Sequence, residues 1–360
     1  MRLLHVVGTR PNFVKMAPVV AALRRADPGG HHALVHTGQH YDRMMSGVFL
    51  DELGVPEPDH MLGVGSGSHA SQLGGVLERI APVLEQEAPE LVIVPGDVNS
   101  TLAAALACAH LRIPLAHVEA GLRSFDRSMP EEVNRVLVDQ VSDLLFTHSP
   151  EAEGNLAREG IAAERARFVG NTMIDSLVAL EGRFRDRRAC AEHGLEAGSY
   201  LLVTLHRPAL VDGELLRPAI ERLGEVAKRL PVLFPVHPRT RAALGTGAAT
   251  GAGLRLIDPV GYLDFLSLLS DARAVLTDSG GIQEETTYLG VPCFTLRDNT
   301  ERPITIDAGT NRLLGLDPAS IAEIPALLEA GSEAPAAAPP LWDGHAAERI
   351  AAEVAGFLAG

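Results

Sequence analysis

Short apolar runs alternate with longer segments of helical periodicity along this chain. Each run has three to five residues, and the segment after it carries apolar positions at helical spacing. Such alternation is typical of a parallel sheet covered by helices on both faces. In the first part of the chain these runs are residues 3–7, 33–36, 91–94, 115–118 and 144–146.

A second series of the same kind begins after Gly170. Its predicted strands are residues 200–204, 232–236, 254–257, 274–277 and 293–296. The chain is therefore predicted to be an α/β protein with two Rossmann-like, doubly wound parallel sheets. We expect domains at 1–170 and 171–340, with 171–188 as a helical connector. Residues 329–340 read as a linker before a C-terminal helix in 341–360, which we expect to pack on the first domain.

Composition narrows the class of protein. The 360 residues are 46% hydrophobic and 21% charged, which is ordinary for a soluble globular chain. A net charge of −15 argues against a nucleic-acid surface. Three widely spaced cysteines and the lack of a signal-like start favour a reducing cytoplasm, and no run is long enough to span a membrane.

The segment 277–292 carries the strongest signal for a ligand. A buried strand ends at Thr277, and Ser279, Gly280 and Gly281 open the helix that follows. Ser279 can cap this helix, while the glycines let an anion approach its free N–H groups. Glu285, a turn and a half further on, is placed to accept from a sugar hydroxyl. The alternative is an ordinary capped turn that binds nothing.

Three carboxylates of the first domain lie where chemistry is expected. Asp97 and Glu119 follow predicted strands, and Glu131 opens a helix after Pro130. Carboxyl ends of parallel strands share one edge of the sheet, so the first two acids should face the same crevice. Neighbouring carboxylates suit acid–base catalysis, although an acid in a first helical turn is also an ordinary structural feature.

Cations and a histidine accompany these acids. Arg10 and Lys15 follow the first strand, His206 ends a strand of the second domain, and Arg302 follows the last one. Each is a candidate for a phosphate contact, whereas the alternative reading is a surface cation or a loop residue. The sequence contains neither a dinucleotide-binding fingerprint nor a paired-histidine motif, so we expect no cofactor and no metal.

The motifs, taken in order, resemble the non-hydrolysing UDP-N-acetylglucosamine 2-epimerases, which have the GT-B fold. The similar segments run from 8–11 through 37–40, 96–97, 117–123, 130–135, 170–172 and 278–285 to 300–303. The resemblance implies two domains facing a central cleft, with UDP bound by the second. It implies that Ser279, Gly280, Gly281 and Glu285 hold phosphate and ribose, that Phe265 lines the uracil pocket, and that Arg10 and Arg302 contact the diphosphate or the sugar.

The same resemblance implies a reaction. UDP-N-acetylglucosamine and UDP-N-acetylmannosamine would interconvert by anti elimination of UDP, through a 2-acetamidoglucal, and re-addition. Asp97, Glu119, Glu131 and His206 would be catalytic, with Lys15 in support. The partner would be a UDP-N-acetylhexosamine, and the family implies a homodimer.

Departures from the family pattern leave alternatives open. Asn12 replaces a common glutamate, and the segment before Pro130 is two residues shorter than in well-known bacterial members. Gln39, His40 and Arg207 resemble parts of an allosteric UDP-N-acetylglucosamine site, but residues 41–43 differ from the usual pattern. The competing interpretations are a hydrolysing 2-epimerase, an epimerase of another UDP-2-acetamido sugar, a glycosyltransferase and a non-catalytic UDP-sugar-binding protein.

Overall fold

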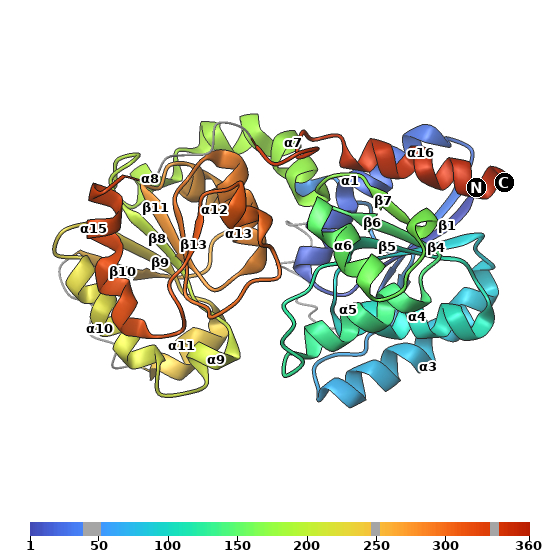
Figure 1. Ribbon diagram of the computed structural model, residues 1–360, viewed down its shortest axis with the longest axis horizontal. Coiled ribbons are helices and arrows are strands. Elements are labelled where there is room, and N and C mark those ends of the chain that lie inside the picture. The colour runs from blue at the N-terminus through green and yellow to red at the C-terminus, as the bar shows by residue number, and fades with distance from the viewer. Residues whose placement is uncertain (39–51, 246–252, 332–337) are drawn as a thin grey trace. The chain divides into compact units, whose positions relative to one another are not determined.

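The computed structural model describes residues 1–38, 52–245, 253–331 and 338–360. The chain divides into two compact units (Figure 1). The first unit comprises Met1–Ala179 and Pro340–Gly360, and the second comprises Leu180–Pro339. Each unit is built on its own parallel sheet.

The first unit contains a seven-stranded sheet in the order β3-β2-β1-β4-β5-β6-β7, and all its neighbours pair in parallel. This is the Rossmann order, in which the chain reverses its direction of travel between β1 and β4. The strands are β1 (Arg2–Val7), β2 (His31–His36), β3 (His60–Met61), β4 (Leu91–Pro95), β5 (Leu115–Ala120), β6 (Leu144–Thr147) and β7 (Ala166–Phe168).

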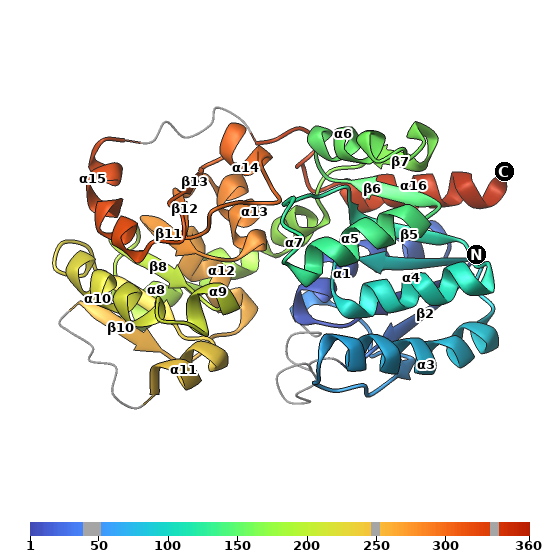
Figure 2. The same cartoon turned by 60° about the horizontal axis from the view of Figure 1, so that its bottom comes forward.

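Helices cover both faces of this sheet (Figures 1 and 2). One face packs against α3, α4 and α5 through a core that includes Val6, Val94, Ile80 and Val138. The other face carries α1 and α16, which pack against each other. The helices of this unit are α1 (Arg10–Ala26), α3 (His69–Glu87), α4 (Asn99–Leu111), α5 (Pro130–Val141), α6 (Pro150–Arg158), η1 (Ala163–Arg165), α7 (Thr172–Arg187), which continues into the second unit, and α16 (Ala346–Ala359).

The second unit repeats this architecture with six strands in the order β10-β9-β8-β11-β12-β13. The order in which the chain adds strands to the sheet reverses its direction between β8 and β11, which is again the Rossmann pattern. The strands are β8 (Leu201–Thr204), β9 (Val232–Pro235), β10 (Leu254–Ile257), β11 (Ala274–Thr277), β12 (Cys293–Thr295) and β13 (Asn311–Leu313).

Two hydrophobic clusters hold the second sheet between its helices. One joins the sheet to α10, η3 and α15, and the other joins it to α8, α12 and α13. The helices are α8 (Ala189–Glu192), α9 (Pro208–Val211), α10 (Leu216–Val226), α11 (Pro238–Leu244), α12 (Tyr262–Ser270), α13 (Gly280–Leu289), α14 (Ile304–Asp307), η3 (Pro318–Glu323) and α15 (Ile324–Glu329).

The C-terminal segment is part of the first unit rather than an appendage. The buried Trp342 donates from Nε1 to the backbone oxygen of His148 at 2.9 Å. Asp175 accepts from the backbone N–H groups of Ala346 and Ala347 at 3.1 and 2.6 Å, which satisfies the start of α16. Gly170 is required here, because a Cβ at this position would lie 2.0 Å from the oxygen of Leu341.

The predicted fold class is confirmed, and all ten predicted strands are present, with small shifts at their ends. The sequence did not predict β3, β7 and β13, which have two or three residues each. Such short strands carry too few positions for a periodic signal. In the described part of the chain, no helix combines the length and apolarity needed to cross a bilayer.

Candidate functional site

Each sheet has a point where neighbouring strands send their connections to opposite faces, and ligands of open α/β sheets bind there. In the first unit this point lies between the ends of β1 and β4, where Gly8 and Gly96 follow the strands. In the second unit it lies between the ends of β8 and β11, near His206 and Asp278. Several of the sequence-predicted residues, among them Asp97, Glu119 and His206, lie at or just after strand ends.

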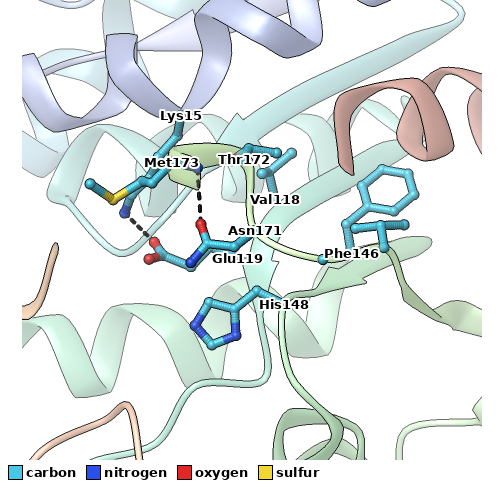
Figure 3. Close-up of a pocket in the computed structure, with 10 residues that line it drawn as sticks. Lys15, Val118, Glu119, Phe146, His148, Asn171, Thr172 and Met173 are labelled. Carbon is cyan, nitrogen blue, oxygen red and sulfur yellow. Dashed lines mark hydrogen bonds and ion pairs between the residues drawn. The ribbon is translucent and has the colours of Figure 1, made fainter. Parts of the chain in front are cut away.

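Lys15 and Glu119 form a buried ion pair in the first unit (Figure 3). Lys15 projects from the second turn of α1, and Glu119 lies near the end of β5. Gly96 adjoins both charges, since a Cβ there would lie 3.1 Å from Lys15 Nζ and 3.2 Å from Glu119 Oε2. The structure therefore rejects the reading of Lys15 as a surface cation, whereas Arg10, at the start of α1, is exposed.

The backbone of Glu119 adopts a conformation that side chains rarely take. Its φ is +72°, and the register between β5 and β6 shifts between Val118 and Ala120. A bulge of this kind re-aims a side chain, and a left-handed non-glycine residue costs on the order of 1–3 kcal/mol. The fold thus holds the Glu119 carboxylate in a direction that a regular strand would not give it.

Asp97 pairs with Arg135 of α5, and Arg135 also contacts Glu132 at 2.5 Å. Glu132 is buried and accepts from the backbone N–H groups of Ser124 and Phe125 at 2.9 and 2.8 Å. Asn134 adds a bond from its side-chain amide to the backbone oxygen of Asp97 at 2.8 Å. These contacts fix the loop after β4 and the loop after β5 to one helix.

Glu131, the predicted third catalytic acid, is half-buried and has no side-chain hydrogen bond or ion pair with the residues that the structure describes. The buried charge network uses its neighbour Glu132 instead. Arg135 is three positions from Glu132 and four from Glu131, so both acids lie within reach on the helix surface, but the ion pair forms with Glu132. Glu132 is thereby a structural anchor that the sequence did not single out.

Asn12 has a local structural role where the family pattern has a glutamate. Its Oδ1 accepts from the backbone N–H groups of Gly8 and Thr9 at 3.0 and 3.2 Å, as part of a capping box at the start of α1. Its Nδ2 donates to the Pro95 oxygen at 3.4 Å, a bond that a carboxylate cannot donate. The amide therefore ties the ends of β1 and β4 together.

A small pocket lies beside the Lys15–Glu119 pair (Figure 3). His148 and Asn171 line it, and sequence reasoning did not identify either residue as part of a site. Both are buried, and Asn171 accepts from the Met173 N–H at 2.9 Å. A signal did exist, because His148 directly follows β6 and thus lies at the same edge of the sheet as Glu119.

In the second unit, His206 is bound to a buried aspartate. Asp278 accepts from the backbone N–H groups of His206 and Arg207, both at 2.7 Å, and its Oδ1 lies 3.1 Å from His206 Nδ1. Burial opposes ionisation of Asp278, but these bonds outweigh it and lower the pKa of the carboxyl below its usual value. The His206 side chain is 39% exposed, so its outer edge remains accessible.

The start of α13 differs in one respect from the prediction. Ser279 occupies the N-cap position, but its hydroxyl makes no capping bond with any described residue, so the predicted cap is wrong. Gly280 leaves room for two charged side chains: a Cβ there would lie 2.3 Å from Arg302 Nη1 and 2.8 Å from Glu301 Oε1, and these groups would have to move. The guanidinium of Arg302 therefore lies directly against the first residue of this helix.

Arg302 belongs to a buried charge cluster next to α13. Its guanidinium contacts Glu301 at 2.5 Å and Glu284 at 3.0 Å. Glu301 also contacts Arg297 at 2.8 Å and, more loosely, Arg207 at 3.6 Å. In the ion pairs between described residues, three arginines contact two glutamates, and this basic cluster lies beside a helix start that favours anions.

Glu285 lies further along α13 and is buried against Tyr262, whose hydroxyl donates to it at 2.9 Å. Burial raises the pKa of Glu285 to about 8; the hydrogen bond from Tyr262 lowers it, and the neighbouring Glu284 charge raises it. Phe265 packs on the cluster that joins α12 and α13 to the sheet. The predicted allosteric residues Gln39 and His40 lie outside the described residues.

The fold and these strand-end sites define an α/β protein with a candidate site at the reversal point of each sheet. The family model for UDP-N-acetylglucosamine 2-epimerases matches residues 22–355. A relative of that name from Methanocaldococcus jannaschii is 43% identical over 88% of this chain and 88% of its own length. The solved structure of the M. jannaschii UDP-GlcNAc 2-epimerase, in complex with UDP-GlcNAc and UDP, has a TM-score of 0.88 at 38% identity, covering 99% of this chain and 100% of that one.

A further relative, the UDP-2,3-diacetamido-2,3-dideoxy-D-glucuronate 2-epimerase of Pseudomonas aeruginosa, is also 43% identical over 88% of both chains. The chain therefore belongs to the UDP-N-acetylglucosamine 2-epimerase family, as its motifs predicted. Members of this family named for two different sugars are equally similar to it.

Proposed function

We propose that this protein interconverts UDP-N-acetylglucosamine and UDP-N-acetylmannosamine by inverting C2. Family membership supports the reaction class. The observation that carries the proposal is the buried Lys15–Glu119 pair beside Gly96 and Asp97, because it places two carboxylates at one edge of the sheet under cationic control. Removal of an unactivated C2 proton needs such a placed base.

UDP would be held by the second unit. The first N–H groups of α13 can donate to a phosphate, and the arginines around Arg302 balance the charge of a diphosphate. Glu285 would accept from ribose hydroxyls, and Phe265 would contact the uracil. His206, with Asp278 on its Nδ1 side, would donate to the departing diphosphate.

The chemistry would proceed by anti elimination. A carboxylate of the first unit takes the C2 proton, the C2–H electron pair forms the C1=C2 double bond, and the C1–O bond breaks as UDP leaves with its electrons. In the return step a proton reaches the opposite face of C2, and UDP re-adds at C1. Asp97, Glu119 and Glu131 are the proposed proton carriers, with Lys15 stabilising the ionised form of Glu119.

Proton NMR of UDP-N-acetylglucosamine incubated with the protein in deuterated buffer tests the proposal. We expect signals of UDP-N-acetylmannosamine to appear with deuterium at C2. Epimerisation that retains the original C2 proton would contradict elimination. Free UDP in the same amount as free N-acetylmannosamine would identify the hydrolysing reaction, and tight UDP binding without turnover would identify a binding protein.

A second candidate substrate is UDP-2,3-diacetamido-2,3-dideoxy-D-glucuronate, since the relative named for it is as similar as the relative named for UDP-N-acetylglucosamine. The C2 chemistry is the same for both sugars, which differ at C3 and C6. Values of kcat/KM measured for both substrates on one preparation decide between them. A higher value for the diacetamido sugar would replace our first choice.

We also propose that the protein acts in the cytoplasm as a homodimer, as the family resemblance implies. Its three cysteines are buried and unpaired, which suits a reducing compartment. Light scattering at several concentrations tests the dimer, and a monomer that is fully active would contradict it. Arg207 remains a proposed allosteric contact, together with Gln39 and His40. The test measures the rate at which UDP-N-acetylmannosamine is converted to UDP-N-acetylglucosamine. A hyperbolic dependence of this rate on added UDP-N-acetylglucosamine would support that role.

A further inference from the structure

A buried histidine behind the candidate carboxylates has an acceptor at each of its ring nitrogens. His117 lies on β5 and is fully buried. Its Nδ1 lies 2.6 Å from Asp139 Oδ1, and its Nε2 lies 2.8 Å from the backbone oxygen of Gly96. A carbonyl oxygen can only accept, so the Nε2 side requires an N–H.

The Nδ1 side requires an N–H as well, because Asp139 is ionised. Its other oxygen accepts from Arg123 at 2.7 Å and from the Gly121 N–H at 3.0 Å. A carboxyl group that binds a guanidinium and a backbone N–H through one oxygen is ionised. Its other oxygen therefore also accepts a hydrogen bond.

We propose that His117 is held as an imidazolium cation and is a positioning residue for the two carboxylates that flank it, Asp97 and Glu119. This inference rests on the proposed function, in which both carboxylates act on the sugar. A neutral imidazole has one N–H, so it would leave either the Gly96 oxygen or the Asp139 carboxylate facing a bare nitrogen in a fully buried place.

The hydrogen bonds explain how the charge acts on the site. Gly96 has a φ of +63° and is tied to β5 twice, through its N–H to the Val118 oxygen at 2.9 Å and through its oxygen to His117. Asp97 is the next residue, and Glu119 follows His117 by two positions on the bulged strand. One doubly donating ring therefore locks the end of β4 to β5 and, through Asp139, to α5.

The charges of the cluster also balance. Arg123 forms a bidentate pair with Glu159, at 2.7 and 2.6 Å, in addition to its contact with Asp139. Two cations and two anions are therefore present when His117 is protonated, and the cluster is neutral. With a neutral His117, these four groups would carry one net negative charge, shared between the buried Asp139 and the partly exposed Glu159.

Nitrogen-15 NMR of the histidine rings tests the protonation state directly. The His117 signals are assigned by their loss in His117→Gln. We expect both ring nitrogens of His117 to show the shifts of an imidazolium at neutral pH in the unliganded protein. Shifts of a neutral tautomer, with one protonated and one bare nitrogen, would overturn the proposal. This measurement needs no turnover, so it stands even if the proposed reaction is absent.

Asp139→Asn tests the positioning role. The Asn amide can still accept from Arg123 and Gly121, but it donates to His117 Nδ1, which converts the ring to the neutral Nε2–H form while keeping the bond to Gly96. We expect kcat to fall by up to about 100-fold with KM changed less than about twofold, because misplacement of a catalytic group acts on the chemical step. An unchanged kcat with a neutral ring would overturn the role.

The matched control is Asp143→Asn at the opposite end of β5, where Asp143 accepts from the Leu115 N–H at 2.9 Å. We expect it to leave kcat and the His117 signals unchanged. If Asp139→Asn does not fold, His117→Gln replaces it, since one Gln amide cannot donate to both partners. The kcat of His117→Gln should fall as that of Asp139→Asn is expected to fall. A kcat equal to that of the wild type would reject the positioning role of His117. A wild-type protein without turnover would instead count against the proposed function.

Discussion

The ammonium of Lys15 is paired with the carboxylate of Glu119, and both side chains are more than nine-tenths buried. In this environment the charge of one group depends on the other. Loss of a single partner from a buried pair leaves an uncompensated charge, which costs about 3–5 kcal/mol unless the remaining group becomes neutral. The pair is therefore both a structural element and a way to fix the position of the Glu119 carboxylate.

Lys15→Met should remove most of the epimerase activity. Without the ammonium, the Glu119 carboxylate loses the cation that holds it beside Gly96, so the base is no longer correctly placed. We expect kcat to fall by at least about 100-fold, the range that general acid–base catalysis contributes. Steady-state kinetics check this. The matched control is Lys228→Met, at an exposed position after α10, which should leave kcat unchanged.

Asp97→Asn should separate chemistry from binding. The amide cannot accept the C2 proton, whereas Arg135 keeps its contact with Glu132 and the loop stays anchored. We expect exchange of the C2 proton with deuterated solvent to fall by at least about 100-fold while the Kd for UDP is unchanged. Exchange at the wild-type rate would exclude Asp97 as a proton carrier. Asp59→Asn, where Asp59 accepts from the Leu34 N–H, is the control.

Gly280→Ala should weaken UDP binding. The new methyl group would lie 2.3 Å from the Arg302 guanidinium and must displace it from the start of α13. We expect a higher Kd for UDP by calorimetry. Gly224→Ala in α10 is the matched control, since its Cβ meets no described atom within 4 Å. It should gain up to about 1 kcal/mol in stability from helix propensity, with an unchanged Kd. Equal Kd values for both variants would reject the role of Gly280.

Glu285→Gln should change how stability depends on pH. The pKa of Glu285 is raised from 4.5 to about 8 in the folded protein, so the unfolded chain releases this proton first as pH rises. The folded state is thus penalised progressively between pH 4.5 and 8, and the penalty is complete above pH 8. Glutamine keeps an acceptor for Tyr262 and carries no proton to lose.

The difference in Tm between Glu285→Gln and the wild type should therefore be more favourable to the variant above pH 8 than below pH 4.5. Thermal unfolding across this range measures it. A difference that does not vary with pH would show that Glu285 titrates normally. Above pH 8, where the wild-type group is ionised, the variant should also bind UDP more weakly, because an amide is a poorer acceptor for ribose hydroxyls than a carboxylate.

The sequence predicted the two sheets and the strand-end positions of Asp97 and Glu119, because buried strands and their polar ends have local signals. It did not predict the pairing of charges. Lys15 looks like an exposed helical cation until α1 is placed against β5, a contact between residues 104 positions apart. The use of Glu132 rather than Glu131 depends on the rotation of α5 about its axis, which the local pattern leaves open.

The sequence also did not predict the cluster of His117, Asp139 and Arg123. Asp139 looks like one more polar residue in a helix, and His117 looks like one in a strand. Their relationship exists only once α5 packs on β5. The bulge at Glu119 is a further example, since no residue type in that strand marks a positive φ.

The return of the chain to its first unit has a consequence for the order of synthesis. The first unit includes Pro340–Gly360, and Trp342 and the N–H groups at the start of α16 make their contacts with residues made much earlier. On the ribosome, the second unit is complete before the first receives its last helix. Domains generally fold as units during translation. The first unit therefore cannot complete its contacts until the whole of the second unit has been translated.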